Sequence, residues 1–257
     1  MAYIEINDVS KVYQRDGEPF HALSHVSLEI ERGEFICLLG PSGCGKTTLL
    51  NTLAGFEHPD EGQVLIGGEA VTEPVPNRVT IFQHYGLLPW QTVEKNVMLG
   101  LLAKKVPKEE ARAIASKYID LVGLSGFEHV RPAQLSGGMQ QRVSIARGLA
   151  VQPDVLLMDE PFAALDAITR LKMQDDIHRI AEEEGVTVVF VTHDIEEAVA
   201  LADRIVVLTP NPGQVKEVVK VELGPDRLRT ADDFLAVRDH VFDVFGMKPN
   251  WNVEYVI

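Results

Sequence analysis

The sequence is short of cysteine, of basic residues and of long apolar runs. Two cysteines among 257 residues, Cys37 and Cys44, are too few for a disulfide framework or a cysteine metal site and are typical of free thiols in a reducing compartment. The densest apolar stretches, such as FICLL and VTVVFV, have the length of strands and are too short to span a membrane. We find no signal peptide, repeat or low-complexity tract, so we expect a soluble protein that remains in the cytoplasm.

Positive charge is also scarce, because 24 Lys and Arg residues stand against 38 Asp and Glu residues, a formal net charge of −14. Without a basic stripe, nucleic acid is not expected as a partner. An acidic protein also gains nothing from an anionic lipid surface, so any membrane attachment would need a protein partner. The simpler interpretation of the charge is solubility.

What is present is a core-forming pattern of strands and helices. Apolar residues make up 46 % of the chain. Residues 3–30 alternate loosely between apolar and polar, which predicts antiparallel strands near a sheet edge. The segments EFICLLG, VLLMDEP and VTVVFVTHD are apolar strands separated by helical segments. This α/β pattern predicts a mostly parallel sheet that is covered on both faces.

Two further segments complete the predicted organisation. Residues 88–150 have helical spacing and predict an α-helical subdomain inserted in an α/β domain of residues 1–224. Gly224-Pro225 marks a break before a short helical tail, residues 225–257. The tail places Phe234, Val237, Val241 and Phe245 on one helical face, so we expect it to dock on its own domain; a regulatory role is the alternative.

The stretch GPSGCGKTT has the phosphate-loop pattern, between an apolar strand and an apolar helix. Glycines let backbone N–H groups surround phosphate oxygens at the positive end of a helix. Lys46 is expected to reach the outer phosphates, and the Thr47 hydroxyl to ligate Mg²⁺. The predicted nucleotide-binding residues here are Gly40, Pro41, Ser42, Gly43, Cys44, Gly45, Lys46, Thr47 and Thr48. A bulky reagent on the Cys44 thiol is expected to block nucleotide binding.

Polar residues follow three other strands, at the edge where parallel sheets place their ligands. Asp159 is suited to hold Mg²⁺, and Glu160 to orient and deprotonate an attacking water. His193 ends the strand VTVVFVT and is expected to contact the γ-phosphate and that water. Gln83, after the strand VTIF, is a further candidate ligand for Mg²⁺ or water.

A second anion-binding helix start is predicted at LSGGMQQR, residues 135–142. Ser136 can cap the first turn, and Gly137 and Gly138 allow close approach to the backbone. A single phosphate loop does not explain this second site.

In combination these motifs resemble the ATP-binding-cassette (ABC) transporter ATPases over nearly the whole chain. GPSGCGKTT looks like the Walker A motif, VLLMDEP like Walker B, LSGGMQQR like the signature and ALD, residues 164–166, like the D-loop. Gln83 and His193 stand where the family has its Q-loop and switch histidine, and Tyr13 where it has an adenine-stacking aromatic.

The resemblance implies a P-loop NTPase core that hydrolyses ATP with Mg²⁺, in which Lys46, Gln83, Glu160 and His193 are catalytic. It also implies that two cassettes pack head to tail, each completing the other's ATP site, which would explain the second helix start. The residues that would act in trans are Ser136, Gly137, Gly138, Gln140 and Asp166.

Within the family, segments such as FQHYGLLPWQTVEKNV and EPFAALDAITR resemble the importers of nitrate, sulfonates, taurine and bicarbonate. The implied partners are a second ATPase subunit, a membrane permease and an extracytoplasmic substrate-binding protein, with this chain on the cytoplasmic face of the membrane. YGLLPW would then receive the permease, or else simply pack between subdomains. The alternatives are a cassette for another cargo such as a vitamin precursor or lipid, a non-transport cassette, and a phosphotransferase.

Overall fold

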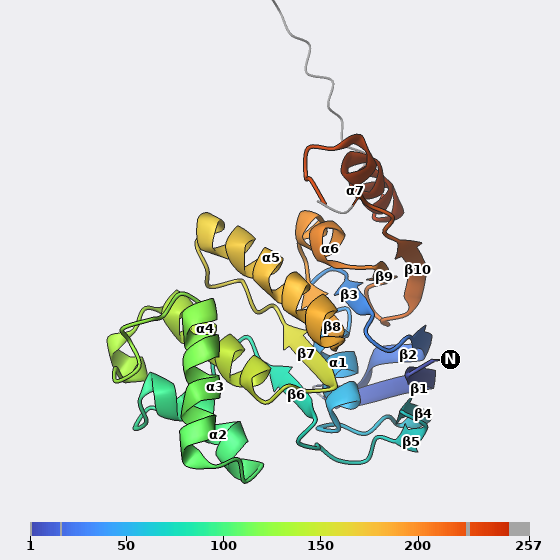
Figure 1. The fold of residues 1–257 in the computed structure, drawn as a ribbon. Coiled ribbons are helices and arrows are strands. Elements are labelled where there is room, and N and C mark those ends of the chain that lie inside the picture. Colours follow the sequence, from blue (N-terminus) through green and yellow to red (C-terminus); the bar gives the residue numbers. More distant parts are fainter. Residues whose placement is uncertain (1, 16, 225–226, 247–257) are drawn as a thin grey trace, which may run out of the picture.

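Two β-sheets organise the part of the chain that the computed structural model describes, which is residues 2–15, 17–224 and 227–246 (Figure 1). The larger sheet has the strand order β10-β9-β3-β8-β7-β6. Its strands are β3 (Phe35–Leu39), β6 (Arg78–Ile81), β7 (Val155–Asp159), β8 (Thr187–Thr192), β9 (Arg204–Leu208) and β10 (Val215–Lys220). All pairs are parallel except β9 with β10, which confirms a mostly parallel sheet and adds one antiparallel edge.

The smaller sheet is antiparallel, in the order β2-β1-β4-β5. Its strands are β1 (Ile4–Arg15), β2 (Glu18–Ile30), β4 (Glu61–Ile66) and β5 (Glu69–Ala70). The long pairing of β1 with β2 agrees with the alternation in the sequence.

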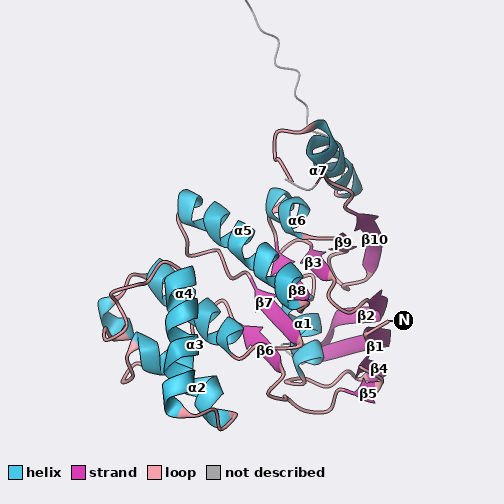
Figure 2. Ribbon diagram, in the orientation of Figure 1, coloured by secondary structure: helices cyan, strands magenta, loops and turns pink. Residues whose placement is uncertain are grey.

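Seven α-helices surround the two sheets in the described residues (Figure 2). They are α1 (Lys46–Ala54), α2 (Val93–Ala103), α3 (Lys108–Leu121), α4 (Gly137–Ala150), α5 (Ala167–Glu184), α6 (Ile195–Leu201) and α7 (Asp232–Val244). A 3₁₀ turn, Pro132–Gln134, precedes α4. No helix in this part of the chain is long and apolar enough to cross a bilayer.

The core lies on both faces of the larger sheet, because successive side chains of a strand point to opposite faces. In β3, Phe35, Cys37 and Leu39 join the cluster under helices α5 and α6, whereas Ile36 and Leu38 join the cluster under α1 and the smaller sheet. Every side chain of β3 is buried. This two-sided burial explains the continuous apolar run FICLL.

Helices α2, α3 and α4 form a lobe beside the larger sheet, past its edge strand β6 (Figure 1). The lobe meets the sheet at Gly148 of α4, where a Cβ atom would lie 3.1 Å from the Ile81 side chain. At the other end of the chain, α7 packs against α6 and buries Phe234 and Val241. Residues 247–257 of the expected tail, and Pro225 of the expected break, lie outside the described residues.

Candidate active site

The phosphate-loop pattern forms the turn between β3 and α1. Gly43 and Gly45 have φ angles of 79° and 93°, in the left-handed region that favours glycine. A Cβ at Gly45 would also lie 2.5 Å from the carbonyl oxygen of Ala22 in β2. Glycine at 45 is therefore required both by its dihedral angle and by the strand beneath it, and helix α1 begins at the next residue.

Lys46 folds back over this loop and is buried. Its ammonium donates to the carbonyl oxygens of Gly40, at 2.6 Å, and Pro41, at 3.0 Å. The Cys44 thiol lies beneath the loop in the core, with Sγ 3.8 Å from Lys46 Nζ, and burial raises its pKa. The Cys44 thiol therefore belongs to the apolar core under the loop.

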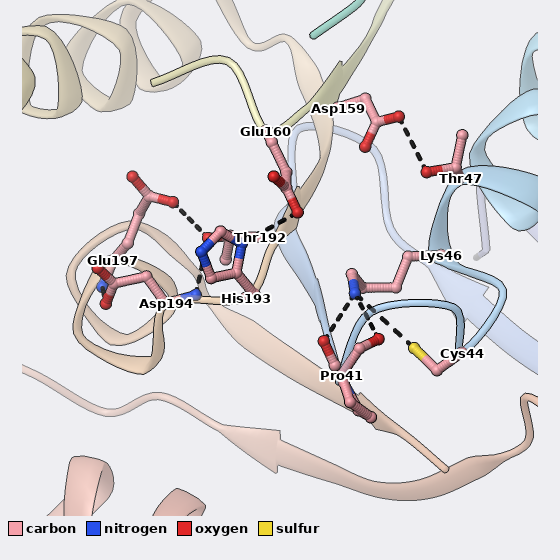
Figure 3. A network of polar contacts seen from close by, with 11 residues as sticks. Pro41, Cys44, Lys46, Thr47, Asp159, Glu160, Thr192, His193, Asp194 and Glu197 are labelled. Atoms are coloured by element: carbon pink, nitrogen blue, oxygen red, sulfur yellow. Dashed lines mark hydrogen bonds and ion pairs between the residues drawn. The ribbon is translucent and has the colours of Figure 1, made fainter. Parts of the chain in front are cut away.

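The two oxygen ligands predicted for a metal ion come together next to Lys46. Thr47 Oγ1 of α1 donates to Asp159 Oδ2, at the carboxyl end of β7, over 3.0 Å (Figure 3). Burial raises the pKa of the Asp159 carboxyl, while the Thr47 hydrogen bond acts in the opposite direction. A hydroxyl beside a carboxylate at a phosphate loop is the oxygen donor set that Mg²⁺ with a nucleotide takes. These residues fit that ion.

Glu160 and His193 meet just after the carboxyl ends of the neighbouring strands β7 and β8. His193 Nδ1 lies 3.0 Å from Glu160 Oε1 (Figure 3). Glu160 has a φ of 46°, which is uncommon for a residue with a side chain, and its N–H donates to the carbonyl of Val191 in β8 at 3.0 Å. The strained turn aims the carboxylate at the imidazole.

Two predicted residues stand apart from this cluster. Gln83 is exposed on the loop after β6, and no hydrogen bond of its side chain is found within the described residues. Tyr13 lies in β1 on the other side of the phosphate loop, where its hydroxyl hydrogen-bonds Glu57 and lies 3.5 Å from Thr48 Oγ1. Tyr13 therefore borders the loop, whereas Gln83 has no fixed partner there.

The second helix start forms as expected at α4. Ser136 is the N-cap, and its hydroxyl accepts from the Met139 N–H at 3.3 Å. Gln140 donates to the Leu135 carbonyl at 3.2 Å. Among the described residues, no hydrogen bond joins the segment 135–138 to the chain's own phosphate loop, residues 40–47. The N-terminal end of α4 is therefore not hydrogen-bonded to the described phosphate loop of its own chain.

The glycines of this helix start touch two other motif loops. A Cβ at Gly137 would lie 2.7 Å from the Tyr85 hydroxyl, and a Cβ at Gly138 would lie 3.1 Å from the Ala164 carbonyl oxygen. Asp166, two residues after Ala164, caps α5: its side-chain carboxylate accepts from the Thr169 N–H at 3.0 Å. The segments 83–86, 136–138 and 164–166 thus meet within one molecule.

Sequence reasoning missed the residues that hold these loops. Arg147 of α4 donates to the carbonyl oxygens of Tyr85, at 3.1 Å, and Gly86, at 2.7 Å. Arg170 of α5 donates to the Leu165 carbonyl at 3.2 Å. The helical pattern marks both arginines only as polar positions, so no signal in the sequence distinguishes them from solvated residues.

Comparison with known proteins decides the family. Residues 23–163 match the family model described as ABC transporter. The chain is 45 % identical to the bicarbonate transport ATP-binding protein CmpD of Synechocystis sp., covering 94 % of this chain and 88 % of the relative. It is 43 % identical to the nitrate import ATP-binding protein NrtD of Synechococcus elongatus, covering 89 % and 85 %. The chain belongs to the ABC transporter family.

A solved structure agrees with this family and with the fold. The dimeric post-hydrolysis ATP-binding cassette MJ0796, bound to ADP and Pi, superposes with a TM-score of 0.79 at 35 % identity, over 86 % of this chain and all of that one. Like other ABC cassettes, the chain uses ATP and Mg²⁺ and is an ATPase. The expected fold class, a P-loop NTPase core with an antiparallel β part and a helical part, is confirmed.

Proposed function

We propose that this cassette powers the import of a small anion, of the nitrate, sulfonate, taurine or bicarbonate type, through a membrane permease. The relatives named for bicarbonate and nitrate support this class of cargo. The observation that carries the catalytic assignment is the pairing of Thr47 with Asp159 and of Glu160 with His193, each at 3.0 Å, at one edge of the sheet.

The phosphate loop would bind the triphosphate of ATP. The Lys46 ammonium, which now donates to two loop carbonyls, would donate to the outer phosphates, and the backbone N–H groups of the loop would surround them. Thr47 and Asp159 would hold Mg²⁺, with Gln83 as a further ligand. When bound, the ion neutralises charge on the phosphates. The Tyr13 ring, which borders Thr48, would stack on the adenine.

Glu160 and His193 would perform the hydrolysis. The Glu160 carboxylate would accept a proton from the water that attacks the γ-phosphorus, a role worth about 10²- to 10⁴-fold in rate for a positioned base. His193, held against Glu160 Oε1, would orient that carboxylate and contact the γ-phosphate. Both groups lie across from Lys46 in the same cluster (Figure 3).

The ATP site would be completed by a second cassette, identical or paralogous. Ser136, Gly137, Gly138 and Gln140 lie at the start of α4, where the helix dipole favours an anion. With Asp166 of the neighbouring loop, they would face the γ-phosphate bound to the partner. Two observations support this arrangement: among the described residues the start of α4 makes no hydrogen bond to the phosphate loop of its own chain, and the similar cassette MJ0796 is dimeric.

The permease would dock near the loop that carries Gln83. Trp90 is 66 % exposed there, and Phe82 is also exposed and stacks on Phe56 with ring centroids 5.7 Å apart. Leu87 packs on the core, and the backbone N–H and C=O of Leu88 hydrogen-bond the side-chain amide of the buried Asn96. The Leu87 side chain thus serves packing, and the aromatic side chains are available to a partner. The chain would lie on the cytoplasmic face of the membrane, with an extracytoplasmic binding protein supplying the solute.

The catalytic part of the proposal is tested with Glu160→Gln, which keeps the size of the side chain and removes the base. We expect ATP binding to persist, hydrolysis to fall at least about 10²-fold, and a stable dimer to form with ATP. Size-exclusion chromatography with saturating MgATP measures the dimer. A variant that stays monomeric while binding ATP contradicts the shared site.

The cargo is tested separately, with the cassette, its permease and its binding protein reconstituted in vesicles. We expect ATP hydrolysis to rise with nitrate, bicarbonate, taurine or an alkanesulfonate. Stimulation only by an uncharged vitamin precursor or by a lipid contradicts the anion assignment and leaves the catalytic assignment intact.

A further inference from the structure

Behind the Glu160–His193 pair lies a chain of buried polar side chains that the proposed mechanism does not use. Thr192, which ends β8, is 2 % exposed, Gln174 of α5 is 2 % exposed and Glu197 of α6 is 7 % exposed. Most buried polar groups in a core are paired, and a fully paired network specifies one geometry. This network therefore specifies the geometry of the segments that it joins.

The hydrogen bonds of this network converge on the Glu197 carboxylate. The Thr192 hydroxyl donates to one oxygen of Glu197, and Gln174 Nε2 donates to the other at 2.8 Å. Gln174 Oε1 in turn accepts from the guanidinium of Arg229, in the segment between β10 and α7. A guanidinium only donates and a carboxylate only accepts, so the Gln174 amide has a single satisfied orientation.

The other end of the chain fixes the loop that carries His193. Thr192 Oγ1, which donates to Glu197, also accepts from the Asp194 N–H at 3.0 Å. The Thr192 hydroxyl therefore links the two residues on either side of His193, Thr192 and Asp194 (Figure 3). The His193 side chain itself is 62 % exposed and touches Glu160, so its own packing does little to hold it.

Space behind the pair makes such a tie necessary. A cavity of about 140 Å³ is lined by Glu160 and His193 together with Arg170, Thr192 and Glu197. An imidazole with open space behind it can turn away from the carboxylate unless its backbone is fixed.

We propose that Glu197, oriented by Gln174 and Arg229, is a positioning residue that holds His193 against Glu160 for ATP hydrolysis. This inference rests on the proposed role of His193. It gives Arg229, which follows β10, an indirect part in hydrolysis, since this arginine acts on the loop of His193 through the side chains of Gln174, Glu197 and Thr192. Neither Gln174 nor Arg229 touches the reacting atoms.

The decisive experiment exchanges the two ends of one hydrogen bond. Glu197→Gln replaces one of the two acceptor oxygens with an NH₂ group, so that either the Gln174 amide or the Thr192 hydroxyl loses its acceptor. We expect kcat for ATP to fall about tenfold, which corresponds to roughly 1.4 kcal/mol in the barrier, with KM within about twofold. The double variant Gln174→Glu/Glu197→Gln restores every donor and acceptor. In it, the carboxylate at position 174 accepts both from Arg229 and from the amide at position 197, whose oxygen accepts from Thr192.

The expected result is recovery of kcat to within about threefold of the unchanged protein. Glu196→Gln is the matched control, because the Glu196 side chain is 56 % exposed and its ion-pair partner is Arg238, at 3.8 Å. It should leave kcat unchanged. Thermal unfolding of all variants, and assays well below their melting temperatures, separate positioning from loss of folded protein.

Arg229→Ala is measured in parallel. Arg229 is the half-exposed outer member of the hydrogen-bonded network, so its removal takes away no core side chain. We expect kcat to fall roughly threefold and KM to stay unchanged. Normal kcat in Glu197→Gln or Arg229→Ala overturns the inference, and so does an exchange variant as slow as the single ones. If His193→Ala hydrolyses ATP at the normal rate, the proposed role of His193 is wrong and the inference falls with it.

Discussion

Gly213, in the turn between β9 and β10, supports the phosphate loop from below, and replacing it with alanine should damage nucleotide binding from outside the motif. A Cβ at Gly213 would lie 2.2 Å from the carbonyl oxygen of Cys44 and 2.9 Å from that of Ala22. Its own N–H and C=O are engaged with Ala22 and with Ser24 of β2, both at 3.0 Å. The turn therefore cannot retreat without breaking those bonds.

The magnitude follows from the geometry. Real Cβ atoms do not approach closer than 3.0 Å, so the Cys44 carbonyl has to move by about 0.8 Å, and the phosphate loop with it. A misplacement near 1 Å at a binding site can lower activity about 10²-fold, and overpacking of this kind destabilises a fold by about 1–3 kcal/mol. We expect Gly213→Ala to weaken ATP binding about ten- to hundredfold and to lower the melting temperature by a few degrees.

Isothermal titration with MgATP and thermal unfolding by circular dichroism measure the two effects. Gly224→Ala is the matched control, because its Cβ would find its nearest neighbour, Asp233 Oδ2, at 3.7 Å, and its φ is not in the left-handed region. A Gly213→Ala protein that binds ATP as tightly as the unchanged one would refute the reasoning that this turn supports the loop.

Three further outcomes are expected. Ser136→Arg should abolish hydrolysis and leave the ATP affinity of the isolated chain nearly intact; a collapse of that affinity in a titration would show that the α4 start serves the chain's own site. In a Cys37→Ala background, a bulky maleimide should react slowly with the buried Cys44 thiol, whose pKa burial raises, and should abolish ATP binding once attached; full binding by stoichiometrically labelled protein would contradict this. Burial, and to a smaller extent the charge of Arg227, lowers the pKa of His178 below 6.5. The unfolded chain therefore binds more protons at this residue than the folded one, and the free energy of unfolding should fall as the pH drops below 6.5. His178→Leu should flatten that slope in urea titrations between about pH 5 and 8, and an unchanged slope would refute the assignment.

Motifs with strict local requirements were predictable from the sequence. A phosphate loop needs glycines at left-handed positions between a strand and a helix, and Gly43 and Gly45 take those angles. The carboxyl ends of parallel strands meet at one edge, so Asp159, Glu160 and His193 could be expected to cluster from the order of the segments. The parallel sheet itself followed from its continuous apolar runs.

Contacts that depend on packing between distant segments were not predictable. The Cys44 thiol is buried in a core cluster that includes Leu23 of β2 and Leu208 of β9, which lie about 20 and about 160 residues away along the sequence. Gln174 and Glu197 read as ordinary polar positions of amphipathic helices, because their periodicity does not reveal that they face each other. The division into residues 1–224 and 225–257 stays a prediction.

The contact between Gly137 and the Tyr85 hydroxyl has a consequence for how this chain can vary. The Tyr85 hydroxyl occupies the volume that a methyl group at 137 would need, so a neighbouring loop of the same molecule favours glycine there in its present arrangement. Substitutions at the two positions are thus coupled: a larger residue at 137 requires the aromatic side chain at 85 to move aside or to be shortened.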